Sequence, residues 1–343
     1  MIKVYLRKIK RKLTFILTKN SFRLPKSEKP KAFIFGIPDH ANLGDQAIAI
    51  AENNFIKTHT KFIPVLIEFS QTNSAIKKVK KKISKNDVIL LHGGGNLGDL
   101  YLREENLRRT VISTFSSNKV VVFPQSSFFK NDDELVTSQK IYSNHQDLTI
   151  FARDHASFIK LRKLFPSTNI KLSPDIVISL PVCTKKVSAN NVILLAFRQD
   201  IEINDTSLKK KVKQIISKKY NFYDTDTVLA EQPYINSFNR NKVVRSKLRE
   251  FSNANLVVTD RLHGMIFSFL TNTPCIVFNN STGKVKNFYQ SWFTNFEKIV
   301  FMKKFDESLF LNAIEKLLKI NTDNLFDVNK NFKNLKETID HNE

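Results

Sequence analysis

The chain alternates short apolar runs with longer segments in which apolar residues recur at helical spacing. Short apolar runs predict buried strands, and helical spacing predicts amphipathic helices. In the first half of the chain, strands are expected at residues 31–36, 62–69, 88–91, 119–123 and 148–152, each followed by a helical pattern. This alternation is typical of α/β proteins with a doubly wound parallel sheet.

A polar, proline-containing stretch at residues 180–191 interrupts this alternation, which then restarts at residue 192. The length of 343 residues also suits two domains of ordinary size. We therefore expect two doubly wound, Rossmann-like domains that face a central cleft. The expected division is a basic arm at 1–30, an N-terminal α/β domain at 31–180, a C-terminal α/β domain at 190–320 and a poorly specified polar tail at 321–343.

The net charge of +23 is concentrated near the N-terminus, where residues 1–31 hold eleven Lys and Arg but only Glu28 as an acid. Apolar residues between these cations predict a basic amphipathic helix that binds an anionic membrane surface. The second interpretation is that the chain is simply rich in Lys and Asn, so that its positive charge has no binding partner. Nucleic acid is the third and is not expected as a partner, because zinc-finger spacing, RNA-binding aromatic motifs and basic-zipper heptads are lacking.

The sequence also limits the cellular compartments in which the protein is expected. No apolar run approaches the ~18 residues that a membrane-spanning helix needs, and Lys and Arg interrupt the N-terminal apolar residues throughout. The two cysteines, Cys183 and Cys275, are far apart in the chain and suggest neither a disulfide scaffold nor a metal site. We expect a cytoplasmic protein, with peripheral attachment to the inner face of the membrane through the arm.

Glycine is scarce, and its distribution points to a binding edge. The ligand site of an open α/β sheet lies beyond the C-terminal ends of its strands. All eight glycines fall at or just beyond predicted strand ends: Gly36, Gly44, Gly93, Gly94, Gly95, Gly98, Gly264 and Gly283. This distribution predicts a substrate-binding cleft at one edge of the sheets.

The run Val257–Met265 predicts a strand that turns directly into a helix, with Arg261 and His263 at the turn. Backbone N–H groups at a helix start favour an anion, and a histidine can move protons near neutral pH. Taken alone, the segment also fits an ordinary turn with a surface arginine. However, Arg153 and Arg198 occupy other strand ends, where the three cations could converge on a doubly anionic ligand.

Other motifs leave alternatives open. Gly93-x-Gly95-x-x-Gly98 matches the dinucleotide fingerprint, but it follows the third strand and lacks the ribose-binding acid, which favours a loop for a sugar or phosphate. Asp45 is equally suited to be a helix N-cap or a general base. His92 fits a core or a cleft position, and the Asp224/Asp226 pair fits a solvated turn better than a metal site.

Taken together, six motifs resemble the polysaccharide pyruvyl transferase family, in order and from about Phe33 to Trp292. They are Asn42-Leu-Gly-Asp45, His92-Gly-Gly-Gly-Asn-Leu-Gly-Asp99, Phe151-Ala-Arg153-Asp154-x-x-Ser157, Ser173-Pro-Asp175, Thr259-Asp-Arg-Leu-His-Gly264 and Asn280-Ser-Thr-Gly-Lys284. The resemblance implies an enzyme that transfers pyruvate from phosphoenolpyruvate to a saccharide acceptor as a ketal, during synthesis of a capsule, exopolysaccharide or cell-wall polymer. It also implies a GT-B-like fold with the donor between the domains, and neither a cofactor nor a metal is expected.

The resemblance and the strand-end positions together assign the site residues. His263 is expected to be the acid, Arg261 to stabilise anionic charge, and Asp45, or less securely Asp260, to be the base. The expected donor-binding residues are Arg153, Arg198, Arg261, Leu262, His263, Gly264 and Lys284. The expected acceptor-binding residues are Asn42, Asp45, His92, Gly93, Gly94, Gly95 and Asn96.

Two rival functions stay open at this stage. One is a GT-B glycosyltransferase that uses a nucleotide sugar, in which a nucleoside pocket would replace the phosphoenolpyruvate arginines. The other is a non-catalytic membrane-surface assembly protein that retains the fold. The intact Arg153, Arg261, His263 and glycine loop argue against the second.

Overall fold

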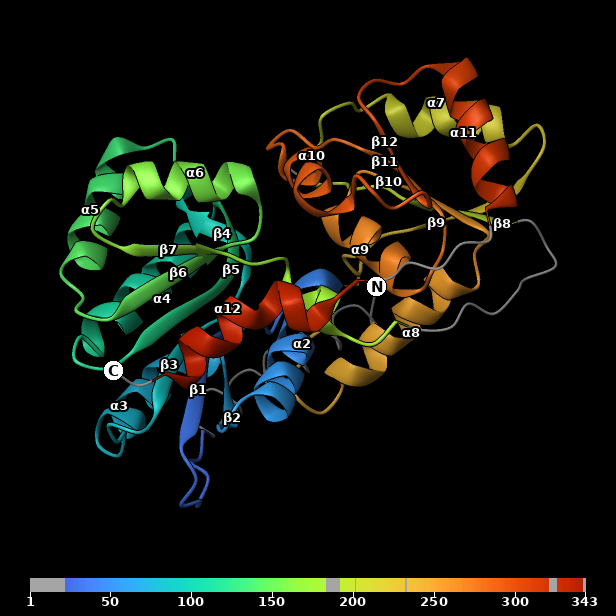
Figure 1. The fold of residues 1–343 in the computed structure, drawn as a ribbon. Helices are drawn as coiled ribbons and strands as arrows, with labels where there is room; N and C mark the ends of the chain where they lie inside the picture. Colours follow the sequence, from blue (N-terminus) through green and yellow to red (C-terminus); the bar gives the residue numbers. More distant parts are fainter. Residues whose placement is uncertain (1–21, 183–191, 201, 232, 321–325, 342–343) are drawn as a thin grey trace, which may run out of the picture.

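The structure is a computed structural model that describes residues 22–182, 192–200, 202–231, 233–320 and 326–341. The expected helix of the basic arm and most of the expected linker therefore lie outside the described residues. Two parallel sheets, each with helices on both faces, make up the described part (Figure 1). The prediction of two doubly wound, Rossmann-like domains is confirmed.

The first sheet has seven strands, and all of its pairings are parallel. Its order is β2-β1-β3-β5-β6-β7, with β4 paired to β5. The strands are β1 (Lys31–Ile37), β2 (Ile63–Glu68), β3 (Val88–Leu91), β4 (Gly94–Gly98), β5 (Val120–Phe128), β6 (Leu148–Ala152) and β7 (Asn169–Leu172). Its helices are α2 (Leu43–His59), α3 (Thr72–Lys80), α4 (Leu102–Thr114), α5 (Asp132–Ser143) and α6 (His155–Leu164).

The second sheet has five parallel strands in the order β12-β11-β10-β8-β9. They are β8 (Val192–Ala196), β9 (Asn221–Thr225), β10 (Leu256–Thr259), β11 (Cys275–Phe278) and β12 (Ile299–Met302). Its helices are α7 (Leu208–Ile216), α8 (Arg240–Ser252), α9 (Leu262–Leu270), α10 (Lys284–Phe288) and α11 (Glu307–Lys319). The apolar pattern did not predict β7, β9 or β12, which are edge strands with at least one face partly exposed.

One continuous apolar cluster joins the two domains. Ile34 of β1 and Ala47 of α2 belong to the same buried cluster as Leu194 of β8 and Phe267 of α9. The opposite face of each sheet has a core of its own. Because the shared cluster is fully buried, it holds the C-terminal ends of both sheets toward each other across the cleft.

The end of the chain differs from the expected polar tail. It contains α12 (Val328–Asp340), which returns to the first domain and lies beside α2 (Figure 1). Phe332, Leu335 and Ile339 are buried, and the ring centroids of Phe332 and Phe55 are 5.7 Å apart. These three apolar residues recur at helical spacing within an Asn- and Lys-rich segment, which is enough to bury one face of a helix.

None of the helices in the described residues has the length and hydrophobicity that crossing a bilayer requires.

Candidate active site

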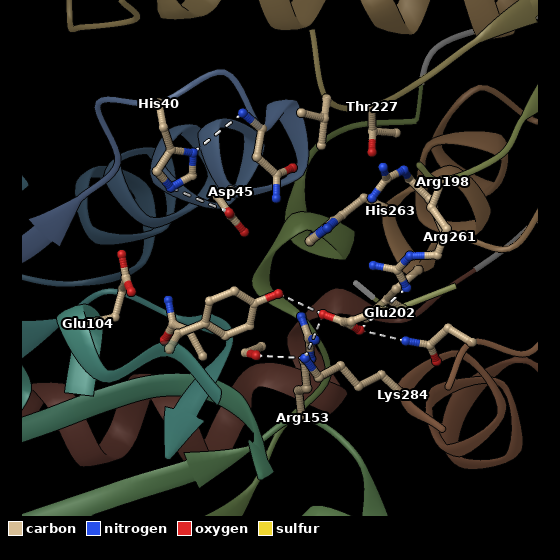
Figure 2. A pocket seen from close by; sticks show the side chains of 17 residues that line it. His40, Asp45, Glu104, Arg153, Arg198, Glu202, Thr227, Arg261, His263 and Lys284 are labelled. Carbon is tan, nitrogen blue, oxygen red and sulfur yellow. Dashed lines mark hydrogen bonds and ion pairs between the residues drawn. The ribbon is translucent and has the colours of Figure 1, made fainter. Parts of the chain in front are cut away.

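A cavity of about 320 Å³ lies between the domains, and the loops that follow the strands of both sheets line it (Figure 2). The structure brings ten of the fourteen expected site residues to this cavity. The first domain contributes Asn42, Asp45, Gly95, Asn96 and Arg153, and the second contributes Arg198, Arg261, Leu262, His263 and Lys284. Parallel topology explains the convergence, because the C-terminal ends of parallel strands share one edge.

The other four expected residues lie behind the cavity wall. A Cβ atom at Gly264 would stand 2.3 Å from Thr259 Oγ1, so this glycine lets α9 begin directly against β10. His92 Nδ1 is 2.7 Å from Glu52 Oε2, and the Gly93 amide donates to Glu52 Oε1 at 2.8 Å. Gly94 has a φ of 125°, which few other residues adopt. Glu52 thus holds His92 and Gly93 at the start of β4, while Gly264 serves the packing of α9 on β10.

His263 contacts the first domain although it belongs to the second. Its Nε2 is 3.5 Å from Asp175 Oδ2, and its ring lies against the start of α2, where a Cβ atom at Gly44 would be 2.2 Å from Nδ1. Burial alone would raise the pKa of the Asp175 carboxyl. The neighbouring His263 and Arg153 side chains outweigh burial and hold that pKa below its usual range. An anionic Asp175 is therefore placed to orient the His263 ring.

Arg153 is the second side chain that contacts Asp175. It follows β6 and is only 2% exposed. Its Nη1 donates to Asp175 Oδ2 at 2.9 Å, and its Nε donates to Ser126 Oγ at 2.8 Å. A Cβ atom at Gly95 would lie 2.6 Å from Nη2, so the remaining edge of the guanidinium faces Gly95 of β4. Two of the three guanidinium nitrogens are therefore held before a ligand arrives.

Arg261 is the N-cap of α9 and is engaged by two carboxylates. Its Nη1 donates to Asp200 Oδ2 and its Nη2 to Asp226 Oδ2, each at 2.8 Å. The expectation that Asp226 lies in a solvated turn is wrong, because its carboxylate is drawn to the buried guanidinium. Asp224, its neighbour in the motif, pairs instead with Lys209 at 3.2 Å on the surface.

Glu202 is a site residue that the sequence did not reveal. Glu202 is 5% exposed, and its carboxylate accepts hydrogen bonds from Tyr101 Oη (2.8 Å), Asn280 Nδ2 (2.7 Å) and Thr282 Oγ1 (2.9 Å). Burial opposes its ionisation, but Lys284 and Arg198 outweigh burial and lower the pKa of Glu202. Asn280 was visible in the sixth motif. Glu202 and Tyr101 carried no signal, because no spacing or periodicity marks them.

The loop after β1 and the start of α2 form the wall of the cavity beside His263 (Figure 2). His40 Nε2 lies 3.7 Å from Asp45 Oδ2. The N-cap of α2 is Asn42, whose Oδ1 accepts from the Gly44 amide at 3.1 Å. The N-cap reading of Asp45 is therefore wrong, and its carboxylate lies in the first turn of α2 and reaches the cavity.

Asp260, the weaker candidate for the base, lies away from the lining of the cavity. Its Oδ1 accepts from the Arg198 amide at 2.8 Å, and burial raises the pKa of its carboxyl to about 6. The hydrogen bond from the Arg198 amide assigns Asp260 to holding the loop after β8. No three His, Cys, Asp or Glu side chains are grouped as metal ligands within the described ranges.

Comparison with known proteins shows the family of the chain. A model of the polysaccharide pyruvyl transferase family matches residues 42–282. General stress protein 30 of Bacillus subtilis is 35% identical over 90% of this chain and 91% of its own length. Pyruvyl transferase 1 of Schizosaccharomyces pombe is 29% identical over 76% of this chain and 69% of its own length.

Among solved structures, an uncharacterized protein from Klebsiella pneumoniae has a TM-score of 0.55 at 21% identity, covering 86% of this chain and 99% of that chain. That likeness concerns the two-domain fold alone. The family match, by contrast, spans most of the chain and includes the cavity residues from Asn42 to Asn280. The chain therefore belongs to the polysaccharide pyruvyl transferase family, whose members are transferases of polysaccharide synthesis.

Proposed function

We propose that this protein transfers the pyruvyl unit of phosphoenolpyruvate to two hydroxyls of one sugar residue, as a cyclic ketal, during synthesis of a capsule, exopolysaccharide or cell-wall polymer. The observation that carries the proposal is the meeting of His263 and Arg153, from opposite domains, on the single carboxylate of Asp175. This arrangement places a proton donor beside a fixed cation in a cavity that both domains close.

Phosphoenolpyruvate carries a carboxylate and a phosphate, which cations and helix-start amides bind well. Arg153, Arg198, Arg261 and Lys284 line the cavity on the side of the second sheet and β6. We assign these four residues to the donor. Asn42, Asp45 and Asn96 line the opposite side, which we assign to the saccharide.

The reaction begins when His263 gives a proton to the methylene carbon of the donor, whose π electrons form the new C–H bond. The neighbouring carbon becomes electrophilic, and the oxygen of one sugar hydroxyl bonds to it while Asp45 accepts the hydroxyl proton. The bond to the phosphate oxygen then breaks, and phosphate leaves with its electron pair. The second hydroxyl bonds to the same carbon and closes the ketal, and its proton leaves with phosphate. Arg153 and Arg261 stabilise the anionic charge throughout.

The central test is mass spectrometry of saccharide acceptors after incubation with the protein and phosphoenolpyruvate. The ketal adds about 70 mass units, from the stoichiometry of the covalent transfer. We expect Arg261→Ala to raise the KM for phosphoenolpyruvate and His263→Ala to lower kcat more than affinity. His341→Ala, at the exposed C-cap residue that follows the C-terminal helix α12, is the matched control. Unchanged kcat in His263→Ala would remove this residue from the role of acid.

Thermal-shift measurements separate this function from nucleotide-sugar transfer. Phosphoenolpyruvate should raise the Tm, because a ligand that binds only the folded state stabilises it. UDP- and GDP-sugars should leave the Tm unchanged. Stabilisation by a nucleotide sugar and not by phosphoenolpyruvate would reject the proposal.

We further propose that the basic arm attaches the protein to an anionic membrane surface, where lipid-linked saccharide acceptors would be within reach. The support is compositional, since residues 1–31 carry eleven cations and one acid. A variant without residues 1–24 should lose binding to vesicles that contain anionic lipid. Undiminished binding of this variant would reject the attachment.

A further inference from the structure

The cations of the cavity are already paired with carboxylates of the chain. Among the described residues that line it, Arg153 pairs with Asp175, Arg261 with Asp200 and Asp226, Arg198 with Asp200 and Glu202, and Lys284 with Glu202. Asp45 and Glu104 add further negative charge to the lining. As it stands, the cavity offers no excess of positive charge to a multiply charged anion, so some carboxylate has to give way when such a ligand binds.

Glu202 is the carboxylate best placed to give way. It lies between donors from both domains (Figure 2), because Tyr101 comes from the first domain and Asn280, Thr282 and Lys284 from the second. Lys284 Nζ is 3.3 Å from Oε1, and Arg198 Nη1 is 3.3 Å from Oε2. We call Tyr101, Arg198, Asn280, Thr282 and Lys284 the Glu202 cradle.

The cradle suits a phosphate better than a carboxylate. Its five side chains include two cations and two hydroxyls that converge on one group. A carboxylate has about four lone-pair sites on two oxygens in one plane, which the five donors exceed. A phosphoryl group presents three terminal oxygens in three directions and more charge, so it can use all five donors.

We propose that the Glu202 carboxylate occupies the subsite for the phosphoryl group of the donor, and that the phosphate displaces it on binding. The inference rests on the proposed donor, phosphoenolpyruvate, and assigns its phosphate to the Glu202 cradle. Displacement frees Lys284 Nζ and Arg198 Nη1 for the ligand, while Arg198 Nε keeps its 2.8 Å contact with Asp200 Oδ1. Return of Glu202 to the cradle then helps to expel inorganic phosphate after transfer.

The test is isothermal titration calorimetry with inorganic phosphate and with phosphoenolpyruvate. Tyr101→Phe and Thr282→Val each remove one hydroxyl donor without changing charge, and each should weaken phosphate binding about tenfold, as expected for a hydrogen bond to a charged group. Tyr223→Phe is the matched control, because the Tyr223 hydroxyl bonds the Glu250 carbonyl at an exposed edge. Glu202→Gln should tighten phosphate binding about tenfold, and by more than Glu104→Gln, which removes a charge from the same cavity but from outside the cradle.

The outcomes are distinct. If both hydroxyl variants bind phosphate as the wild type does, the cradle serves Glu202 alone and the inference is wrong. Weaker phosphate binding by folded Glu202→Gln would also overturn it, because Glu202 would then support the site instead of occupying it. If Glu202→Gln does not fold, the hydroxyl variants decide the question. If the wild type binds phosphate but not phosphoenolpyruvate, the proposed function fails while the phosphate subsite stands.

Discussion

Gly44→Ala tests whether the contact between the domains sets the position of His263. Gly44 lies in the first turn of α2 and lacks a positive φ, so alanine fits its backbone and should favour the helix by up to ~1 kcal/mol. The added methyl group, however, would stand 2.2 Å from His263 Nδ1, 2.5 Å from Cγ and 2.9 Å from Cβ. The clash therefore involves the root of the imidazole and not only its end.

The size of the effect follows from these distances. Carbon and nitrogen atoms pack at roughly 3.5 Å, so the His263 ring must move by about 1 Å or the domains must separate by as much. Either movement breaks the 3.5 Å contact between His263 and Asp175. A displacement of ~1 Å at a catalytic group can cost about 100-fold in rate. We expect kcat for pyruvyl transfer to fall by about that factor and the free energy of unfolding to fall by about 1–3 kcal/mol.

A double-mutant cycle with His263→Ala provides the assay. Urea denaturation gives the stability of the wild type, both single variants and the double variant, and phosphate release gives the rates. Once the ring is absent, Gly44→Ala should become neutral or slightly stabilising, because only the helix preference remains. If Gly44→Ala costs the same stability with and without the imidazole, the clash is not the cause and the reasoning fails.

Three further predictions concern other parts of the site. Burial raises the pKa of Asp260 from 3.8 to about 6, so the stability linked to its protonated form is fully present below about pH 4 and is lost as the pH rises through about 6. Asp260→Asn should remove this loss and should be more stable than the wild type by about 1–3 kcal/mol above pH 6. Urea denaturation between pH 4.5 and 7.5 measures the difference. If the free energy of unfolding depends on pH in the same way in both proteins, the assignment is wrong. Trp292 is the only tryptophan in the chain, and its Nε1 donates to the Arg153 carbonyl at 2.8 Å, so its fluorescence should change when phosphoenolpyruvate is added. Trp292→Phe removes this hydrogen bond and should raise the KM for phosphoenolpyruvate about threefold to tenfold. An unchanged KM would show that the hydrogen bond is dispensable. Gly264→Ala should lower stability by about 1–3 kcal/mol in thermal denaturation, because its Cβ would press on Thr259 Oγ1, and a wild-type Tm would show that α9 shifts freely.

Much of the fold could be read from the sequence because it depends on local pattern. Short apolar runs such as Val88–Leu91 and Leu256–Thr259 predict strands, and the alternation of these runs with helical patterns predicts a parallel topology. Parallel topology brings strand ends to one edge, so Arg153, Arg198 and Arg261 could be expected to converge without any knowledge of the contacts. Edge strands such as β9 escaped this reasoning, because an exposed strand needs little apolar sequence.

The tertiary structure decided which charges meet. Asp175 contacts both Arg153 of its own domain and His263 of the other. Asp226 pairs with Arg261, and Glu202 lies among donors from both domains. Such pairs depend on how two sheets are docked, and docking depends on a buried apolar cluster whose members are far apart in the chain. By itself the sequence determined the elements and the edge at which the chemistry would lie, since those follow from periodicity over a few neighbouring residues. Only the docked domains decided the partners of each charged group, because an ion pair requires two side chains within a few ångströms and sequence spacing sets no such distance across a domain interface.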